Sequence, residues 1–173
     1  MKIFIQARTS SKRLPGKVFK TLINKNHSLD LLIYKLSKLF SKKRIVILTS
    51  KNKSDDAIQK YCKKNKINYF RGSLKNVAGR FLEALKVYRC KYFMRVSADS
   101  PLLDMNIIKI FIKYIKSNKF DIITNVNPRT FPKGQSVEIV KSQTFIDNFK
   151  RFKSKKNFEH VTNFFYNFES NFK

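Results

Sequence analysis

Residues 6–17 combine cations, hydroxyl groups and a tight turn in a way that suits phosphate binding. This stretch directly follows a short apolar segment, and it holds four basic residues, three hydroxyl residues and a Pro-Gly pair. Small residues let backbone N–H groups approach an anion, and Arg13 and Lys17 can neutralise its charge. We interpret the stretch as a phosphate-binding loop, although it matches neither a P-loop nor a dinucleotide-binding fingerprint. The alternative is an exposed basic loop without a ligand.

A second stretch, residues 95–104, places a carboxylate after a predicted strand. The whole chain has 11 acidic residues, and Asp99 and Asp104 flank the proline turn of this stretch. A carboxylate in this position can hold Mg²⁺ against a phosphate oxygen, which makes Asp99 a candidate metal ligand. The alternative is that Asp99 only forms the turn before Pro101. For Asp104 we expect a cap on the following helix.

A third group of polar residues lies between positions 125 and 138. Arg129 and Lys133 could clamp an acidic substrate, with Asn125 and Glu138 nearby, or the segment could be a basic surface hairpin. Arg71 and Arg80 could each reach a substrate or only decorate the start of a helix. The pair at residues 159–160 could serve capping and packing, or could contact a substrate.

The elements that must position these groups alternate between strands and helices. Short apolar runs predict six strands, at residues 2–7, 44–49, 67–70, 92–96, 120–124 and 137–140. Apolar residues at helical spacing predict helices at residues 29–40, 55–62, 77–88, 104–115 and 142–149, with a helical tail from residue 157. We expect Ser54 to cap the second helix, with Asp55 and Asp56 in its first turn.

This alternation predicts one α/β domain over residues 1–173, with a doubly wound, mostly parallel sheet and helices on both faces. Ligands bind outside the carboxyl ends of the strands in such folds. The loops to examine are therefore residues 6–17, 49–56, 71–80, 97–104 and 125–134.

Composition narrows the class of protein. Hydrophobic residues make up 42% of the 173 positions, which is typical of a globular chain. No apolar run approaches the roughly 20 residues that cross a bilayer, and the N-terminus lacks the features of a signal peptide, so we expect no membrane association and a cytoplasmic location. Cys62 and Cys90 are expected to be free and packed.

The net charge of +27 raises the question of nucleic-acid binding. The excess is mostly lysine and is spread along the whole chain, together with abundant Asn, Ile and Phe. All four residue types have A/T-rich codons, so a bias in base composition explains the pattern. We therefore expect no dedicated nucleic-acid role, although the charge should strengthen binding of a triphosphate.

The motifs resemble those of the cytidylyltransferase family that includes CMP-octulosonate and acylneuraminate synthetases. The resemblance is greatest to the branch of spore-coat polysaccharide biosynthesis protein F. The matching stretches follow the family order at residues 5–8, 13–17, 70–73, 95–102, 124–125, 129–134, 137–138 and 159–162. The resemblance implies a Rossmann-like nucleotide-diphospho-sugar transferase fold.

The same resemblance implies an activity. The enzyme would transfer CMP from CTP to an acidic sugar and release pyrophosphate, for the synthesis of a surface polysaccharide or glycan. Its cofactor would be Mg²⁺, bound by Asp99, and its assembly a homodimer. Arg13, Lys17 and Asp99 would be catalytic. The resemblance assigns the nucleotide to Gln6, Ala7, Arg8, Ser11, Ser97 and Ala98, and the sugar to Arg71, Arg80, Asn125, Arg129, Lys133, Gln135 and Glu138.

Members of the family continue beyond residues 159–162 to a further strand and helix, and a late Asp there is a second metal ligand. The resemblance implies that this chain lacks that segment, and Glu138 is the least implausible substitute for the Asp. The alternatives are an inactive or partial relative, a nucleotidyltransferase that uses another nucleotide, and a basic nucleic-acid-binding domain.

Overall fold

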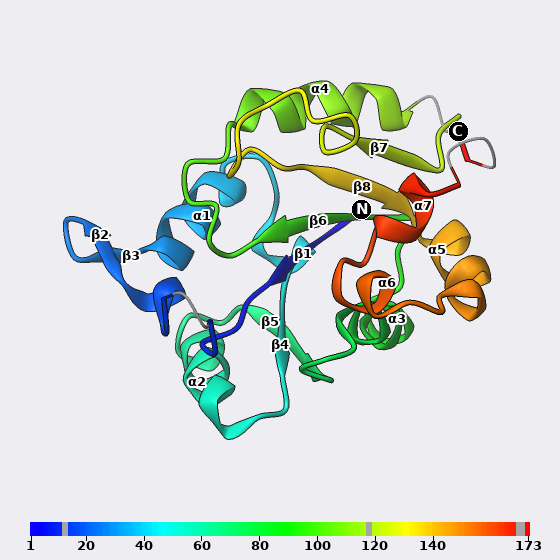
Figure 1. Cartoon of the computed structure of the whole chain (residues 1–173). Helices are drawn as coiled ribbons and strands as arrows, with labels where there is room; N and C mark the ends of the chain where they lie inside the picture. The colour runs from blue at the N-terminus through cyan, green and yellow to red at the C-terminus, as the bar shows by residue number, and fades with distance from the viewer. Residues whose placement is uncertain (12–13, 117–118, 169–171) are drawn as a thin grey trace.

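The fold is built around a six-stranded sheet. The structure is a computed structural model that describes residues 1–11, 14–116, 119–168 and 172–173. The strand order across the sheet is β5-β4-β1-β6-β8-β7 (Figure 1). The strands are β1 (Lys2–Gln6), β4 (Ile45–Ser50), β5 (Asn68–Gly72), β6 (Tyr92–Ser97), β7 (Ile122–Thr124) and β8 (Glu138–Lys141). The comparison with the sequence confirms all six predicted strands, with shifts of one or two residues at their ends.

The sheet is mostly parallel, as predicted, with one strand reversed. β1 pairs in parallel with β4 and β6, and β4 pairs in parallel with β5. β8 is antiparallel to both β6 and β7, so β7 runs in the same direction as the other four strands. No helix separates β7 from β8, and a parallel pair would need such a crossover. The loops after β1, β4, β5, β6 and β7 therefore all emerge at one edge of the sheet.

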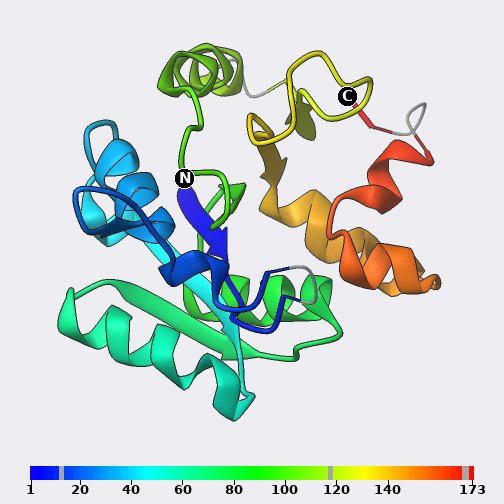
Figure 2. The ribbon, with the colours of Figure 1, turned by 60° about the vertical axis from the view of Figure 1, so that its left-hand side comes forward.

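Helices cover both faces and create two cores. One core joins the sheet to α1 (Ser28–Ser37), α2 (Asp56–Lys64) and α4 (Met105–Lys116). The other joins it to α3 (Val77–Val87), α5 (Ser142–Asn148) and α7 (Asn163–Tyr166), next to the short helix α6 (Lys155–Glu159). In Figure 2, α4, α1 and α2 follow one another along one side, and α5, α6 and α7 lie on the other.

Side chains of successive residues in a strand enter opposite cores. Ile3 and Ile5 of β1 belong to the first core, whereas Phe4 lies in the second, where its ring contacts those of Phe81 and Phe93. Burial on both faces explains why these strands are continuous apolar runs in the sequence.

The starts of the helices confirm one predicted cap and correct another. Asp104 caps α4, because its Oδ1 accepts the backbone N–H of Asn106 at 2.8 Å. The prediction for Ser54 was wrong: it lies in the 3-10 turn Lys53–Asp55, and α2 begins at Asp56.

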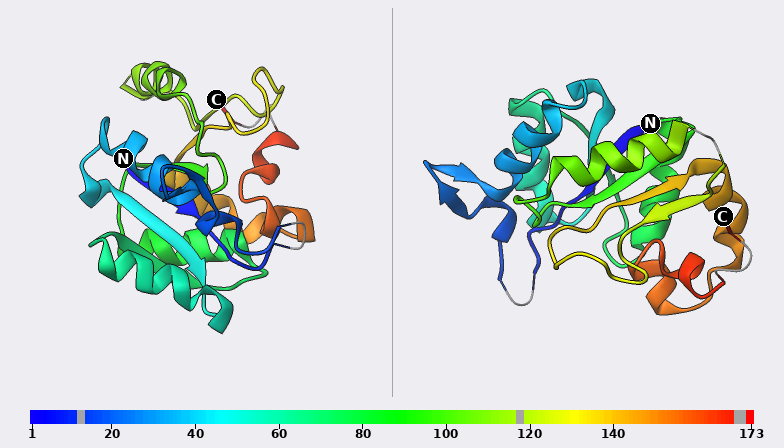
Figure 3. Two further views of the ribbon diagram at one scale, coloured as in Figure 1. Left: turned by 90° about the vertical axis from the view of Figure 1, so that its left-hand side faces the viewer. Right: turned by 90° about the horizontal axis from the view of Figure 1, so that it is seen from above.

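A small hairpin was not predicted. β2 (Thr21–Ile23) and β3 (Asn26–His27) pair in antiparallel fashion and project from the body beside α1 (Figure 3). Asn24 and Lys25 link them with φ angles of 47° and 62°, the left-handed conformation that a two-residue hairpin turn requires.

Two features agree with the composition. None of the helices in the described part of the chain has the length and apolar character that a membrane crossing needs. Cys62 is buried in the first core, Cys90 is half-buried, and both are free thiols.

Candidate functional site

Two adjoining pockets open at the carboxyl edge of the sheet. The first pocket has a volume of about 180 Å³. It is lined by the ends of β1 and β6 and the segments that follow them, by Val77 and Arg80 of α3, and by Glu159 and His160. The second pocket, of about 410 Å³, extends from the β6 loop toward α7 and the segment before β8. The two share five lining residues, which are Gln6, Arg95, Ser97, Asp99 and His160, so they form one cleft.

Lys17 and Asp99 meet in this cleft. They are 82 residues apart in the sequence, and the Lys17 ammonium donates a hydrogen bond to Asp99 Oδ2 in an ion pair. Ser97 donates its hydroxyl hydrogen to the other carboxylate oxygen. Burial alone would raise the pKa of Asp99, but the hydrogen bonds from Lys17 and Ser97 outweigh it and lower the pKa overall. Asp99 is therefore a carboxylate at neutral pH.

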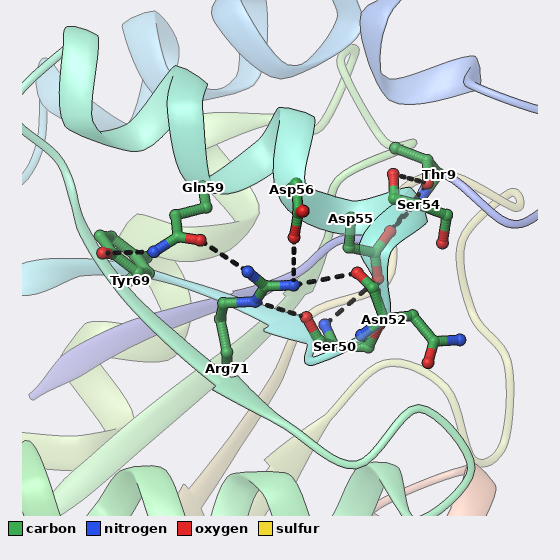
Figure 4. A network of polar contacts seen from close by, with 9 residues as sticks. All are labelled: Thr9, Ser50, Asn52, Ser54, Asp55, Asp56, Gln59, Tyr69 and Arg71. Carbon is green, nitrogen blue, oxygen red and sulfur yellow. Dashed lines mark hydrogen bonds and ion pairs between the residues drawn. The ribbon is translucent and has the colours of Figure 1, made fainter.

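Asp55 anchors the loop that carries Lys17, a role that the sequence analysis missed (Figure 4). The Asp55 side chain is fully buried. Its Oδ1 accepts both the backbone N–H and the hydroxyl of Thr9, and its Oδ2 accepts the backbone N–H and the hydroxyl of Ser50. Burial acts to raise the pKa of Asp55, but these hydrogen bonds lower it overall. The loop after β1 is thus fixed to the turn after β4.

A second buried carboxylate lies beneath the second pocket. Glu138 is 2% exposed and forms an ion pair with Arg95, whose Nε also donates to Gln6 Oε1 at 3.0 Å. The other oxygen of Glu138 accepts hydrogen bonds from the hydroxyl groups of Thr162 and Tyr166. Burial and the Glu138 charge raise the pKa of Tyr166, so its hydroxyl remains a donor. The network links β1, β6 and β8 to the C-terminal helices.

This network does not favour Glu138 as a substitute metal ligand, and that role stays a prediction. Glu138 lines the second pocket, but both of its oxygens already accept hydrogen bonds and its charge is balanced by Arg95. Its place in the fold is that of a positioning residue for Arg95.

Most of the residues expected to bind the nucleotide line the first pocket, namely Gln6, Ala7, Arg8, Ser97 and Ala98. Lys17 and Asp99, which were expected to be catalytic, line it as well. Ser11 is buried, with 8% of its surface exposed, and its hydroxyl accepts a long hydrogen bond of 3.4 Å from the N–H of Leu14. It does not line either pocket. Arg13 lies outside the described residues, so its expected catalytic role stays a prediction.

Arg80 also lines the first pocket and does not line the second. Arg71 is different: its guanidinium bonds to Gln59, to the carbonyl oxygens of Ser50 and Asn52, and to Asp56 at 2.7 Å (Figure 4). It lines neither pocket. These partners hold Arg71 beneath the loop, outside the cleft, so its expected contact with a substrate stays a prediction that this geometry does not favour.

The segment between β7 and β8 contributes one predicted cation to the cleft. Arg129 lines the second pocket. Asn125 is 3% exposed and holds the segment together through the carbonyl of Gln135 and the N–H of Val137. Gln135 bonds to the backbone of Asp104 and Leu102, and Lys133 is exposed. These three residues do not line either pocket, so their expected contact with a substrate is not reproduced.

Residues 159–162 complete the wall of the cleft, and their pattern in the sequence was ambiguous between packing and substrate contact. Glu159 and His160 line the first pocket, and His160 and Thr162 line the second. Val161 between them is fully buried and has a φ of 30°, which β-branched residues rarely adopt. Packing of Val161 and the bond from Thr162 to Glu138 hold this conformation and direct His160 toward the cleft.

The described residues offer few candidate ligands for a metal ion. They contain no group of three or more His, Cys, Asp or Glu side chains arranged to ligate one. Mg²⁺, however, often uses one or two carboxylates together with substrate phosphates and water. Asp99, ionised and 38% exposed at the cleft, fits the role of such a single ligand.

Comparisons with known proteins identify the family of the chain. The sequence model of a family described as cytidylyltransferase matches residues 3–173. An uncharacterised protein of Methanocaldococcus jannaschii is 35% identical over 162 residues, which cover 94% of this chain and 65% of that protein. Spore coat polysaccharide biosynthesis protein SpsF of Bacillus subtilis is 32% identical over 149 residues, covering 83% and 60%. The chain thus spans less than two thirds of the length of these two relatives.

A solved structure extends the similarity to three dimensions. A cytidylyltransferase from Leptospira borgpetersenii serovar Hardjo-bovis superposes with a TM-score of 0.90 at 29% identity. The match covers 99% of this chain and 72% of the other.

Proposed function

Because the chain belongs to the cytidylyltransferase family, we propose that it transfers CMP from CTP to an acidic sugar with release of pyrophosphate. The product would be a nucleotide sugar for polysaccharide or glycan synthesis, in keeping with the described role of the Bacillus subtilis relative. Homodimer formation stays a prediction that rests on the resemblance, and a cytoplasmic location stays a prediction that rests on the amino-acid sequence.

The observation that carries the proposal is the meeting of Lys17 and Asp99 where the two pockets join. One loop supplies cations for a triphosphate and the other supplies an ionised carboxylate. Two adjoining pockets also match a reaction with two substrates, because the nucleotide and the acceptor must both reach one phosphorus atom.

In this scheme the first pocket takes the nucleotide. Arg8 and Lys17 would lie against the phosphates and neutralise the negative charge that develops as pyrophosphate leaves. A Mg²⁺ ion held by Asp99 and phosphate oxygens would supply further neutralisation of that charge. Asp55 would keep the loop in register with Asp99, because it fixes Thr9 to the end of β4.

The second pocket would take the sugar. Its charged lining residues are Arg95, Arg129, Asp99 and Glu138, and His160 lies beside them. Arg95 balances Glu138, so among the described residues that line this pocket Arg129 is the arginine available for the carboxylate of an acidic sugar. The sugar hydroxyl would then attack the α-phosphorus of CTP from the side of Asp99 and Ser97, which line both pockets.

The test is release of pyrophosphate by the purified chain with Mg²⁺. CTP, UTP, ATP and GTP are each offered with a panel of 2-keto-3-deoxy sugar acids and the corresponding neutral sugars. The proposal expects release with CTP and at least one sugar acid, and loss of that release in Arg129→Met. Lys133→Met is the matched control and should retain release, because Lys133 does not line the cleft. Release with a different nucleotide, or equal release with neutral sugars, would contradict the proposal.

A further inference from the structure

We propose that Arg80 contacts the nucleotide, donating its Nε–H to an oxygen atom of the ligand in the first pocket. This inference rests on the proposed function for the identity of the nucleotide. It gives a specific role to a residue that the sequence alone could not distinguish from Arg71.

Arg80 is a buried cation whose hydrogen-bonding groups are only partly satisfied. Arg80 is 3% exposed, and its Nε has no hydrogen-bond partner among the described residues. Its Nη1 donates to the carbonyl of Ser73 at 3.2 Å. A buried polar group without a partner costs free energy, and the cost is larger for a charged group. Because Arg80 lines the first pocket, a ligand there can supply the missing acceptor.

The surroundings of Arg80 show that it is held in place and is not a chance surface cation. Gly72 leaves room for its stem, since a Cβ at this glycine would lie 2.8 Å from Arg80 Cγ. The carbonyl of the next residue, Ser73, takes one end of the guanidinium. Asn76 caps α3 by accepting the N–H of Gly79 at 2.7 Å, which fixes the turn on which Arg80 stands.

The charges in the first pocket favour an anionic or strongly polar ligand. In the described part of the chain, neither Arg80 nor Arg8 forms an ion pair. Asp99 is paired with Lys17, and the oxygens of nearby Asp55 accept hydrogen bonds from Thr9 and Ser50. Burial lowers the pKa of Arg80 to about 10. The negative charge of Asp55 acts to raise this pKa, and the positive charge of Arg8 acts to lower it further. The guanidinium therefore remains charged at neutral pH.

This arrangement predicts an unusual effect of replacing Arg80. A structural arginine stabilises the fold, so its removal lowers the melting temperature. Replacement of a poorly compensated buried charge by an apolar side chain of similar length is often neutral or stabilising. Arg80→Met should therefore leave the melting temperature of the ligand-free protein unchanged or raise it, while it weakens nucleotide binding.

The experiment measures ligand-free melting temperatures and dissociation constants for CTP by calorimetry. The variants are Arg80→Met, Arg80→Lys and the control Arg89→Met, which removes an exposed arginine located away from the cleft. Cytidine and inorganic tripolyphosphate are titrated as well. Weaker binding of tripolyphosphate places the contact on a phosphate, and weaker binding of cytidine places it on the nucleoside.

We expect Arg80→Met to raise the dissociation constant for CTP about tenfold or more, the size of a lost charge-assisted hydrogen bond, and Arg89→Met to change neither quantity. Parental affinity in Arg80→Met would overturn the inference. If Arg80→Met does not fold, parental affinity in Arg80→Lys overturns it equally. If the parent protein binds ATP and GTP as tightly as CTP, that result contradicts the proposed function. It leaves the inference on Arg80 intact, because the effect of Arg80→Met can still be measured with each nucleotide.

Discussion

Asp55 and Thr9 join two loops that are 46 residues apart in the sequence. Oδ1 of Asp55 accepts the backbone N–H of Thr9 at 2.7 Å and its hydroxyl at 2.8 Å. Thr9 also accepts the N–H of Gly16, so the same residue closes the turn that leads to Lys17. The position of Lys17 relative to Asp99 thus depends on a carboxylate that lies outside the cleft.

Asp55→Asn should weaken both the fold and the nucleotide site. The amide retains one acceptor oxygen but faces N–H donors with its own NH₂ group, so we expect a loss of about 2 kcal/mol in the free energy of unfolding. The KM for CTP should rise more than kcat falls, because the loop is displaced and the reacting groups are retained. Asp56→Asn is the control: its carboxylate is 47% exposed and should affect stability little and the KM not at all.

The loss of stability in Asp55→Asn should depend on pH. The pKa of Asp55 is lower in the folded protein than its usual value of 3.8, so its stabilisation is complete above the unfolded pKa. It is lost as the pH falls through the folded pKa. Chemical unfolding of parent and Asp55→Asn should therefore differ by a constant amount near pH 7 and converge in acid, below pH 3.8. A difference that stayed the same throughout the acidic range would argue against this role.

Asp99→Asn should separate binding from turnover. Removal of a negative charge beside Lys17 leaves the metal-free affinity for CTP equal or higher, because the ammonium no longer has a competing partner. Mg²⁺-dependent release of pyrophosphate should fall by a factor of about 100 or more. Asp104→Asn is the matched control from the same loop, since Asn can also cap α4. Unchanged release in Asp99→Asn would remove this carboxylate from the mechanism.

Arg71→Ala should act on stability and not on the substrate. Its guanidinium makes three hydrogen bonds and an ion pair with Asp56 beneath the loop (Figure 4). We expect the free energy of unfolding to drop by about 2 kcal/mol. Arg71→Lys should recover only part of this loss, because a lysine keeps the charge but lacks the planar fork of donors. At a temperature where the variant is folded, KM for the sugar should equal that of the parent. A selective rise in that KM would restore Arg71 to the substrate site.

Arg95 and Glu138 should be strongly coupled. Removing either partner leaves the other charge buried, so Glu138→Gln and Arg95→Met should each cost about 3 kcal/mol. The double variant should be more stable than the sum of the single losses predicts, which urea unfolding of all four proteins will show. Simple additivity would mean that the ion pair does not organise the second pocket.

The sequence predicted the sheet well because its strands are buried on both faces. Ile3, Phe4 and Ile5 form a continuous apolar run that is difficult to read as a surface element. The reversal of β8 was harder to foresee, because direction depends on the absence of a helix between it and β7. The β2–β3 hairpin has no apolar face to signal it, and all three residues of β2 are exposed.

The residues of the candidate site divide along a similar line. The meeting of Lys17 and Asp99 could be predicted because the loops after β1 and β6 must emerge at the same edge of the sheet. Asp55 was missed because a carboxylate at the start of a helix already has a sufficient local explanation. Arg71 and Arg80 have the same chemistry and both flank helix starts, so their different roles follow from burial and partners, which the sequence does not reveal.

The cleft that Lys17 and Asp99 line is, by the proposed function, a site for a cytidine nucleotide. The most direct measurement is the change in melting temperature of the parent protein with Mg²⁺ and equal concentrations of CTP, ATP or GTP. The account predicts a clearly larger increase with CTP than with either purine nucleotide. Equal increases with all three would show attraction of a highly basic chain for any triphosphate, and would contradict it.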